Sequence, residues 1–440
     1  MMRPDVRLAT AWHFPTPTVV HLDSGLTLWH FDLPGQHVAT FDVVLPAPLT
    51  HEPRGLEGVA NVALHAIDEG TLSHPDGEIG ELLEAQGATL HGTTRHRYTT
   101  FGGQAPSRRL TDVLPLFREV LTQPAYAERD VAHHVEAQIA GYESRLASPG
   151  SANRLALRAA LYDAGHRDAR PASGTPETLE HITAEVAAQW HRNHFSPAGA
   201  TLVVAGATGL DEVLDGVSSW QAPPPVRDGL RPTSPLQQPR VVVLDHPGAV
   251  QATIAMATRT VTRQDPRWPA LRVAGHAMAG AFASRLNLEL RERLGYTYGI
   301  GGGFAPGVDE GQFTVGTSVR TEVAGDAVAR VLDALGAAEP FTGKEAEDAR
   351  QFLIGIAPLA NETSADIVNQ ACTLAASGLG PEYLNAHFAQ LAAVTAEEAT
   401  AAFREVIDPG ALTIAVTGEA AELVPALEQL GLAVSLRPAP

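Results

Sequence analysis

The sequence has little that would serve cysteine chemistry or nucleic-acid binding. Cys372 is the only cysteine among 440 residues, so the chain can form neither an intrachain disulfide nor a thiolate zinc cage. Lysine is almost absent as well, with Lys344 the only one, and 50 acidic residues against 31 basic ones give a formal charge of -19. Because such an excess repels phosphate backbones, we expect no nucleic-acid partner.

Long apolar runs are also missing. No stretch of about 18 consecutive apolar residues occurs. The first twenty residues, MMRPDVRLATAWHFPTPTVV, lack the apolar core of a signal peptide. These absences predict a soluble, cytoplasmic protein with no membrane partner. The composition that is present, 44% hydrophobic and 18% charged, is that of a globular protein, and the length suits two large domains.

A proline-rich stretch divides the chain almost in half. WQAPPPVRDGLRPTSPLQQPR, from Trp220 to Arg240, contains prolines that remove backbone donors and shows weak apolar periodicity. We therefore predict an N-terminal domain over residues 1–218, a linker over 219–240 and a C-terminal domain over 241–440.

The ends of the two halves align without a gap. ITAEVAAQWHRNHFSPAGATLVVAG, from Ile182, matches VTAEEATAAFREVIDPGALTIAVTG, from Val394, at nine of 25 positions. Such agreement indicates an internal duplication. In each copy a helix precedes a short strand that closes on glycine. Thr183 and Thr395 are the expected N-caps, and Glu398 completes a capping box with Thr395.

The order of helical and extended patterns predicts the fold class. Helical segments alternate with pairs of strands in both halves, which favours an α+β fold of two homologous α/β sandwich domains. We expect a mostly antiparallel sheet in each domain, with helices packed on one face. Neighbouring strands such as LTLWHF and HVATFDVVL, between Leu26 and Leu45, argue against a doubly wound parallel sheet.

The segment GLEGVANVALHAIDEGT, from Gly55 to Thr71, resembles the zinc-binding helix of the pitrilysin/insulinase family of peptidases. In active members a GxxHxxEHxxxxGT frame supplies two histidines for zinc and a glutamate that activates the metal-bound water. Here the frame is kept, but Asn61 replaces the first histidine and Leu64 the glutamate, and only His65 remains. An amide is a poor zinc ligand and leucine accepts no proton, so the chain is expected to bind no zinc of its own.

The family's third zinc ligand is a glutamate on a later helix that follows an ER dipeptide, here Glu128-Arg129. Glu136 and Glu143 are both possible counterparts. Neither restores a site that lacks its first ligand and its base. His191 and His194 have a spacing that one helix face could use, but we interpret them as residues of a polar, exposed face.

A second segment keeps the family pattern. SRLNLELRERLGYTYGI, from Ser284, resembles the family's SRLxxxLRExxGLxYxV, with Ser284 as helix cap and Gly295 as helix stop. Arg291 and Tyr298 match the arginine and tyrosine with which relatives hold substrate near the zinc. A guanidinium and a phenol suit a peptide carbonyl or a developing oxyanion. The alternative is structural: Arg291 could pair with a neighbouring glutamate, and Tyr298 could simply pack.

In the first half, GATLHGTTRHRYTTF contains His91 and His96 and falls where the family has a strand, NAxTxxxxTxY, that lies beside bound peptide. The resemblance therefore makes His91 a candidate substrate contact. It extends over roughly residues 17–433 and implies two halves that face each other like a clam shell.

A destroyed zinc motif beside a kept arginine–tyrosine pair implies a particular role. It is that of the non-catalytic, substrate-binding subunit of a heterodimeric zinc metallopeptidase, with zinc carried by a homologous HxxEH partner. An unfolded or short peptide would add as a strand to a sheet edge. Two alternatives remain: a peptide-binding or scaffolding pseudoenzyme without a protease partner, and an autonomous peptidase with a remodelled metal site. The acidic charge of the chain favours basic peptides.

Overall fold

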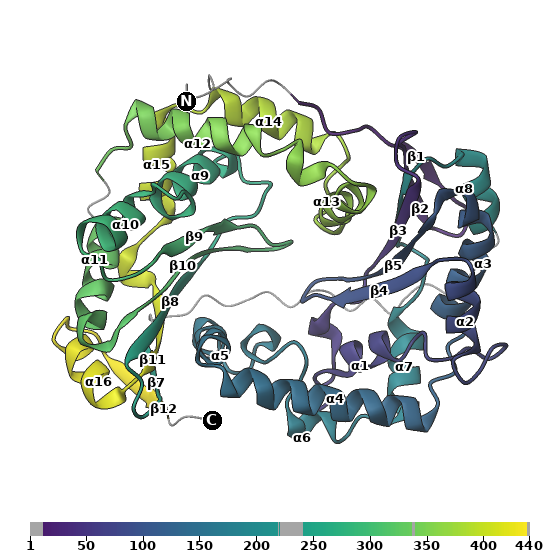
Figure 1. The fold of residues 1–440 in the computed structure, drawn as a ribbon, viewed down its shortest axis with the longest axis horizontal. Helices are drawn as coiled ribbons and strands as arrows, with labels where there is room; N and C mark the ends of the chain where they lie inside the picture. The colour runs from purple at the N-terminus through teal and green to yellow at the C-terminus, as the bar shows by residue number, and fades with distance from the viewer. Residues whose placement is uncertain (1–11, 219, 221–240, 337–338, 438–440) are drawn as a thin grey trace, which may run out of the picture.

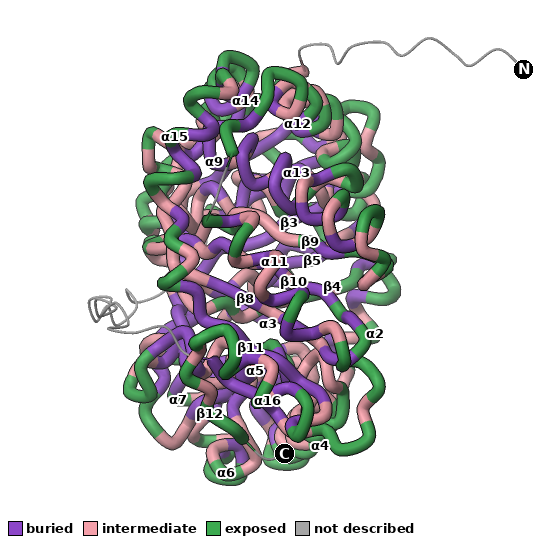
Figure 2. Tube along the Cα trace, turned by 90° about the vertical axis from the view of Figure 1, so that its left-hand side faces the viewer, coloured by how far each residue is buried: buried purple, intermediate pink, exposed green. Residues whose placement is uncertain are grey.

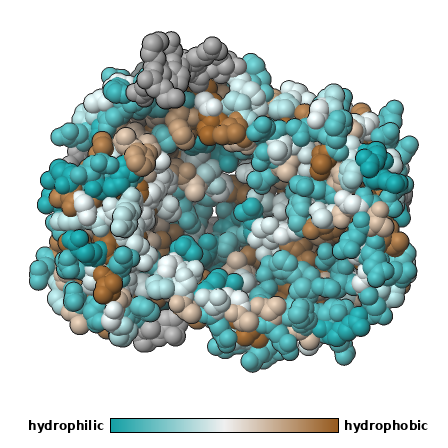
Figure 3. Space-filling model, viewed as in Figure 1, coloured by the Kyte–Doolittle hydropathy of each residue, from teal (hydrophilic) through white to brown (hydrophobic). Residues whose placement is uncertain are grey.

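A computed structural model describes residues 12–218, 220, 241–336 and 339–437. The predicted linker, 219–240, therefore lies outside the described residues except for Trp220. Strands of the described residues form two six-stranded sheets. The sheets stand on opposite sides of the molecule and face each other across its centre (Figure 1). The space-filling view shows that the molecule is hollowed there (Figure 3).

The first sheet has the strand order β1-β2-β6-β3-β5-β4. Its strands are β1 (Thr18–His21), β2 (Thr27–Asp32), β3 (Val38–Leu45), β4 (Thr89–Thr94), β5 (Thr99–Pro106) and β6 (Thr201–Gly206). β2 and β6 run parallel, and the other pairs run antiparallel. The expected neighbours β2 and β3 are thus separated by β6. β6 is buried along nearly its whole length, which suits a central strand and not an edge.

The second sheet has the order β12-β7-β11-β8-β10-β9, which repeats the first order in five strands. Its strands are β7 (Val241–Asp245), β8 (Gln251–Thr260), β9 (Ile300–Ala305), β10 (Gly311–Arg320), β11 (Thr413–Gly418) and β12 (Val434–Arg437). The outermost strand differs, because β12 follows β11 in the chain and runs parallel to β7, whereas β1 precedes β2 and runs antiparallel to it. β11, like β6, is the third strand of its sheet and runs parallel to the second. The shared order is what the internal duplication predicts, and the predicted class of two mixed α/β domains is confirmed.

Helices surround the sheets in both halves. The first half contains α1 (Val59–His65), α2 (Glu78–Ala85), α3 (Leu110–Thr122), α4 (Glu128–Ala147), α5 (Pro149–Leu161), α6 (Pro176–Leu179), α7 (Ala184–His194) and α8 (Leu210–Val217). The second contains α9 (Trp268–Gly275), α10 (Arg285–Asn287), α11 (Ala324–Gly336), α12 (Gly343–Gly355), α13 (Ser364–Ala376), α14 (Tyr383–Ala393), α15 (Ala396–Val406) and α16 (Ala420–Glu428). No helix in the described part of the chain is both long and apolar enough to cross a membrane.

The duplicated helices begin where the sequence predicts. Thr183 caps α7 by accepting a hydrogen bond from the Val186 N–H, and Thr395 caps α15 with the predicted capping box. Each helix precedes the central strand of its sheet. On the outer face of each sheet, helices of the same half bury a continuous apolar core, which appears as the buried tube segments of Figure 2.

The inner face of each sheet carries a helix from the other half, which the sequence did not predict. α13 packs on the first sheet, where Ile367 and Ala371 lie among Trp29 and Val203. α5 packs on the second sheet through Ala152, Ala156 and Ala160, small residues on one face that let the helix approach the strands closely. Each half therefore completes the other, as Figure 1 shows. We expected helices on one face of each sheet. This is true of the helices from the same half, which cover the outer face, but the inner face is also covered by a helix from the other half.

Candidate functional site

The helix that carries the altered zinc motif, α1, is held firmly at its N-terminus. The Glu52 carboxylate accepts hydrogen bonds from the Gly58 N–H at 3.1 Å and the Ala60 N–H at 3.0 Å. Its other oxygen lies 2.6 Å from Arg167, and both side chains are buried. Burial raises the pKa of Glu52, and Arg167 opposes that shift. The carboxylate also complements the helix dipole, so α1 keeps a fixed position despite the changed motif.

Asn61, at the place of the first zinc-binding histidine, belongs to a neutral hydrogen-bond network. Its Nδ2 donates to Gln138 Oε1 on α4 at 2.5 Å, and its Oδ1 accepts from Thr94 Oγ1 on β4 at 3.1 Å. Gln138 Nε2 donates to the Ser173 carbonyl at 2.8 Å. Both amide oxygens that could approach a metal ion thus already accept hydrogen bonds. The network ties α1 to α4 and to the edge of the first sheet.

Leu64, at the place of the catalytic glutamate, is a core residue. It is 3% exposed. Its side chain fills the space above Gly92 on β4, where an added Cβ would lie only 2.8 Å from Leu64 Cδ1. The side chain therefore joins α1 to the sheet by apolar packing, and it offers no atom that could accept a proton from water.

His65, the remaining motif histidine, faces another histidine. Its ring stacks on that of His134 with centroids 6.2 Å apart. His134 Nε2 lies 2.8 Å from Glu69 Oε1. Desolvation lowers the pKa of His65, and the nearby His134 lowers it further. His65 is therefore neutral at pH 7, which suits a metal ligand as well as a stacked ring.

Two residues of α4 that contact α1 are His134 and Gln138, one helical turn apart. Glu136 and Glu143, the two candidates for the third ligand, are both exposed. From the sequence we considered only carboxylates for the third ligand and therefore did not consider Gln138, whose side chain is close to that of glutamate in shape. In the described residues no group of three or more His, Cys, Asp or Glu side chains is arranged to hold a metal ion. Two amides, a leucine and one histidine of the motif do not fit zinc.

The segment that carries the arginine–tyrosine pair starts and stops as expected. Ser284 Oγ accepts from the Asn287 N–H, and Gly295 has the left-handed φ of 64° that glycine favours. The turns between them depart from a regular α-helix, because Leu288–Arg293 is π-helical. A π-helical turn re-aims the side chains that follow it, and such turns are frequent at functional sites.

Arg291 lies in that π-helical turn and is fixed in place. Its Nη2 donates to the Phe282 carbonyl at 3.0 Å, and its Cζ lies 3.6 Å from the centroid of the Phe282 ring. Its Nε donates to Glu292 Oε1 at 2.9 Å. The glutamate pairing foreseen as the structural alternative thus exists, but Glu292 is 58% exposed, and the guanidinium retains further donors.

Tyr298 is 100% exposed, so the alternative in which it packs is wrong. Its loop is ordered by its neighbours, because Thr297 Oγ1 donates to the Gly299 carbonyl at 2.9 Å. Among the described residues no hydrogen bond joins Tyr298 to Arg291. The phenol is therefore presented to solvent on a fixed loop, between the π-helical turn and β9.

His91 lies on β4, which is the edge strand of the first sheet and pairs only with β5. Gly92 faces the core at Leu64, so His91 faces the inner side of the sheet. Its Nε2 lies 3.0 Å from Asp42 Oδ1, and this hydrogen bond raises the pKa of His91 although burial opposes the shift. The backbone along the free side of β4 is left to pair with an added strand.

The interpretation of His191 and His194 as exposed residues is wrong, because both are 7% exposed. His191 Nε2 lies 2.9 Å from the Leu121 carbonyl, and burial lowers the pKa of His191 to about 4. Histidine is polar, so the sequence of α7 alone does not distinguish a buried histidine from an exposed one.

A charged cluster at the contact between the halves is not predicted by the sequence. Asp168 lies 2.7 Å from His96 Nδ1, 2.7 Å from Arg97 Nη2 and 3.3 Å from Arg158 Nη2. Arg97 Nε also lies 2.7 Å from Asp309 in the loop between β9 and β10. Arg97 therefore joins the hairpin of the edge strand β4 to the corresponding hairpin of the second sheet.

Two family profiles match consecutive parts of the chain. The profile described as "Insulinase (Peptidase family M16)" matches residues 32–183, and the one described as "Peptidase M16 inactive domain" matches residues 181–353. The chain belongs to the M16 peptidase family. The resemblance noted in the sequence is confirmed at this level, whereas neither profile decides whether this M16 chain holds zinc.

Relatives and solved structures extend the M16 match. A Streptomyces coelicolor protein described as an uncharacterized zinc protease is 23% identical over 287 residues, which are 63% of this chain and 62% of the relative. A Mycobacterium tuberculosis protein with the same description is 24% identical over 327 residues, 72% of this chain and 74% of the relative. The chain thus spans less than two thirds of the length of the Streptomyces relative.

The fold of this M16 chain is close to that of two crystal structures. One is described as a peptidase M16 inactive domain from Pseudomonas fluorescens, with a TM-score of 0.84, 22% identity, and coverage of 92% of this chain and 98% of the other. The second is described as a protease from Helicobacter pylori, with a TM-score of 0.82, 16% identity, and coverage of 92% and 100%. At these identities the likeness shows the fold.

Proposed function

We propose that this chain is the zinc-less, substrate-binding subunit of a heterodimeric M16 metallopeptidase. Its partner is an M16 chain with an intact HxxEH motif that holds the zinc. The observation that carries the proposal is the neutral hydrogen-bond network of Asn61 and Gln138, which involves the residue that the resemblance aligns with the first zinc-binding histidine. The description of M16 relatives as zinc proteases supports a role in peptide hydrolysis.

The motif helix of this chain lacks the groups needed for hydrolysis. Peptide hydrolysis by a zincin requires a metal ion that acidifies water and a base that accepts the proton. With Asn61 hydrogen-bonded and Leu64 packed on Gly92, the motif helix supplies neither. Hydrolysis then depends on zinc from another chain.

What the chain contributes is substrate binding. The free side of β4 accepts an extended peptide as an additional strand, with His91 beside it on the inner face. Arg291, held by Phe282, and the exposed Tyr298 provide donors to a peptide carbonyl near the partner's zinc. The Arg291 guanidinium is fixed before substrate arrives, which lowers the entropic cost of its contact.

The test is a peptidase assay of this chain, the HxxEH partner and their mixture, using an internally quenched peptide. Activity is expected in the mixture alone. Arg291→Ala and Tyr298→Phe should each lower kcat/KM by about 10- to 100-fold, because each removes one donor to the developing charge. Matched controls lie two residues away: Arg293→Ala breaks only an exposed pair with Glu289, and Tyr296→Phe only a hydrogen bond to Asp326.

The alternatives predict different results. A scaffolding pseudoenzyme leaves the mixture no more active than the partner alone, with the Arg291 and Tyr298 variants unchanged. An autonomous peptidase with a remodelled site shows turnover by this chain alone, abolished by a chelator. Either result would refute the proposal.

A further inference from the structure

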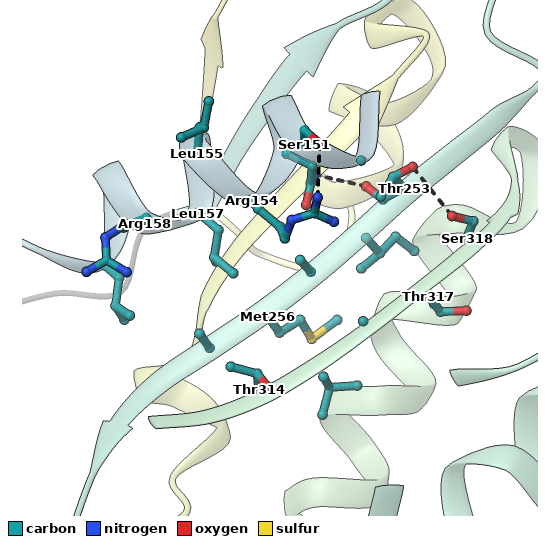
Figure 4. Close-up of a pocket in the computed structure, with 18 of the residues that line it drawn as sticks. Ser151, Arg154, Leu155, Leu157, Arg158, Thr253, Met256, Thr314, Thr317 and Ser318 are labelled. Carbon is teal, nitrogen blue, oxygen red and sulfur yellow. Dashed lines mark hydrogen bonds between the residues drawn. The ribbon is translucent and has the colours of Figure 1, made fainter. Parts of the chain in front are cut away.

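A large cavity lies on the inner face of the second sheet, between α5 and the strands β8 and β10. Its volume is about 890 Å³, within the range of roughly 300–1,000 Å³ of ligand pockets. Figure 4 shows Arg154 and Leu157 projecting from α5 toward the strands that form the floor. None of the interactions described for the zinc motif involves this cavity.

The floor is made of small residues in register. Gly316 on β10 pairs with Ala255 on β8 and with Gly301 on β9, so one cross-strand row has almost no side chains. Thr253 and Ser318 form the next polar row, and their hydroxyls are 3.4 Å apart. Side chains of this size leave room above the sheet for another polypeptide backbone.

The equivalent row of the first sheet is filled. The alignment of the two halves places Val203 on Ala415, which pair with Asp42 and Ala255 respectively. The row through Asp42 therefore corresponds to the row through Ala255. In the first sheet, His91 reaches across this row to Asp42. The second sheet has Ala255 and Gly301 at the places of Asp42 and His91, so this row carries smaller side chains than its counterpart in the first sheet.

The cavity is basic although the chain is acidic. Arg145, Arg154 and Arg158 line it, and none of the lining residues in the described part of the chain is an aspartate or glutamate. Arg145 and Arg154 donate to the hydroxyls of Ser173 and Ser151, at 2.6 and 2.9 Å, and not to carboxylates. In a chain with a formal charge of -19, an arginine-lined cavity without acidic residues favours an anionic ligand.

Arg158 adds to this field. Its only ion pair among the described residues is the 3.3 Å contact with Asp168, a carboxylate it shares with Arg97. Burial lowers the pKa of Arg158, and Arg167 and Arg97 lower it further, while Asp168 raises it. The guanidinium is thus incompletely compensated, and a carboxylate in the cavity would stabilise it.

The cavity lies close to the loop that carries Tyr298. This loop leads directly into β9, and Gly301 of β9 lines the cavity. On the opposite face of β10, Thr317 Oγ1 lies 2.9 Å from Thr297 Oγ1 and 3.0 Å from the Gly299 carbonyl, and these two residues flank Tyr298. The position of Tyr298 is therefore tied to the two strands that form part of the cavity floor.

We propose that this cavity binds an acidic segment of the peptide substrate, with carboxylates on Arg154 and Arg158 and extended backbone on the glycine–alanine floor. The inference rests on the proposed function, because it assigns a substrate class to the same subunit. The net charge of the chain led us to expect a basic peptide. The inference replaces that expectation, because a bound peptide contacts the charges that line the cavity and not the chain as a whole.

The test measures binding to the purified chain alone by fluorescence anisotropy. Three labelled ten-residue peptides of one Ala/Ser/Leu background carry three Glu, three Gln or three Lys residues. The Glu peptide should bind at least about tenfold more tightly than the Lys peptide. Its affinity should fall with added NaCl, because the arginine–carboxylate contacts are screened.

Charge reversal locates the site. Arg154→Glu should weaken the Glu peptide by about tenfold or more and should strengthen the Lys peptide. Arg192→Glu, an equal charge change at an exposed arginine of α7, is the matched control and should leave both affinities unchanged. Equal affinities for the three peptides, no measurable binding, or equal effects of the two reversals would overturn the inference.

The binding assay needs no zinc-bearing partner, so the two proposals fail separately. A mixture that cleaves peptides without charge preference rejects the acidic-segment site and leaves the proposed function intact. Charge-selective binding by a chain that never activates a partner rejects the proposed function. In that case the cavity is a peptide site of a different kind of M16 protein.

Discussion

Replacing Asp168 by asparagine should strongly destabilise the chain. The carboxylate is 2% exposed and lies 2.7 Å from Arg97 Nη2 and 3.3 Å from Arg158 Nη2. Arg97 is itself 8% exposed, so its charge cannot be transferred to water when the carboxylate is removed. Removing one partner of a buried pair costs about 3–5 kcal/mol, mostly because the other charge is left uncompensated.

Asp309→Asn is the matched control, because it removes the second carboxylate of Arg97 at a more exposed position. Asp309 is 32% exposed, and pairs near the surface contribute about 0–1 kcal/mol. The two variants have the same change in charge and the same arginine partner. Their expected difference of roughly 3 kcal/mol therefore reflects the burial of Asp168 together with its additional partners His96 and Arg158.

Guanidinium-induced unfolding followed by tryptophan fluorescence and far-UV circular dichroism gives the free energies. The first transition is compared, because a chain of two large units need not unfold in one step. Asp168→Asn should lower its midpoint markedly and Asp309→Asn only slightly. Equal midpoints for the two variants, or an unchanged midpoint for Asp168→Asn, would refute the assignment of Arg97 and Asp168 as a buried pair.

The pH dependence follows from the same contacts. Burial alone would raise the pKa of Asp168, but hydrogen bonds from His96 and Arg97 bring it well below its ordinary value of 3.8. A carboxylate with a depressed pKa contributes stability that is fully present above the ordinary value and is lost as the pH falls below it. The difference in the free energy of unfolding between wild type and Asp168→Asn should therefore be large at pH 7 and should become smaller below about pH 4.

Three further predictions follow from individual side chains. His387 is 2% exposed, neither ring nitrogen has a hydrogen-bond partner among the described residues, and burial lowers its pKa to about 3. Because a depressed histidine pKa costs stability as the pH falls below 6.5, His387→Phe should stabilise the chain, by about 2 kcal/mol more at pH 5 than at pH 7.5 in thermal unfolding. Cys372 is buried with a raised pKa, so it should react with a thiol reagent at pH 8 only after unfolding; rapid labelling of the native chain would contradict its burial. The double variant Asn61→His/Gln138→Glu should gain zinc affinity measurable by calorimetry, since these side chains already touch and His65 lies on the same helix as Asn61; no gain over wild type would show that position 138 does not correspond to the third ligand.

Local features of the fold could be predicted from the sequence because a few neighbouring residues determine them. The capping box at Thr395, the cap at Ser284 and the left-handed Gly295 each depend on one turn of backbone. The internal duplication could be predicted from the aligned ends of the two halves, and five strands of each sheet share one order.

Long-range features could not be predicted, because no local pattern records them. The insertion of β6 between β2 and β3 joins segments about 160 residues apart, and the exchange of α5 and α13 joins the two halves. The contact between Gln138 and Asn61 could not be predicted, because the sequence was searched for a carboxylate ligand and Gln138 is an amide. The charged residues around Asp168 come from segments that are far apart in the sequence, so their contacts could not be predicted from it.

The zinc content of the purified wild-type chain tests the central claim most directly. The chain is equilibrated with excess zinc, separated from free metal, analysed by inductively coupled plasma mass spectrometry, and assayed in the same preparation for peptide cleavage. The account predicts far less than one zinc ion per chain and no cleavage without the HxxEH partner. One zinc ion per chain, lost in His65→Ala together with chelator-sensitive cleavage by the chain alone, would contradict it.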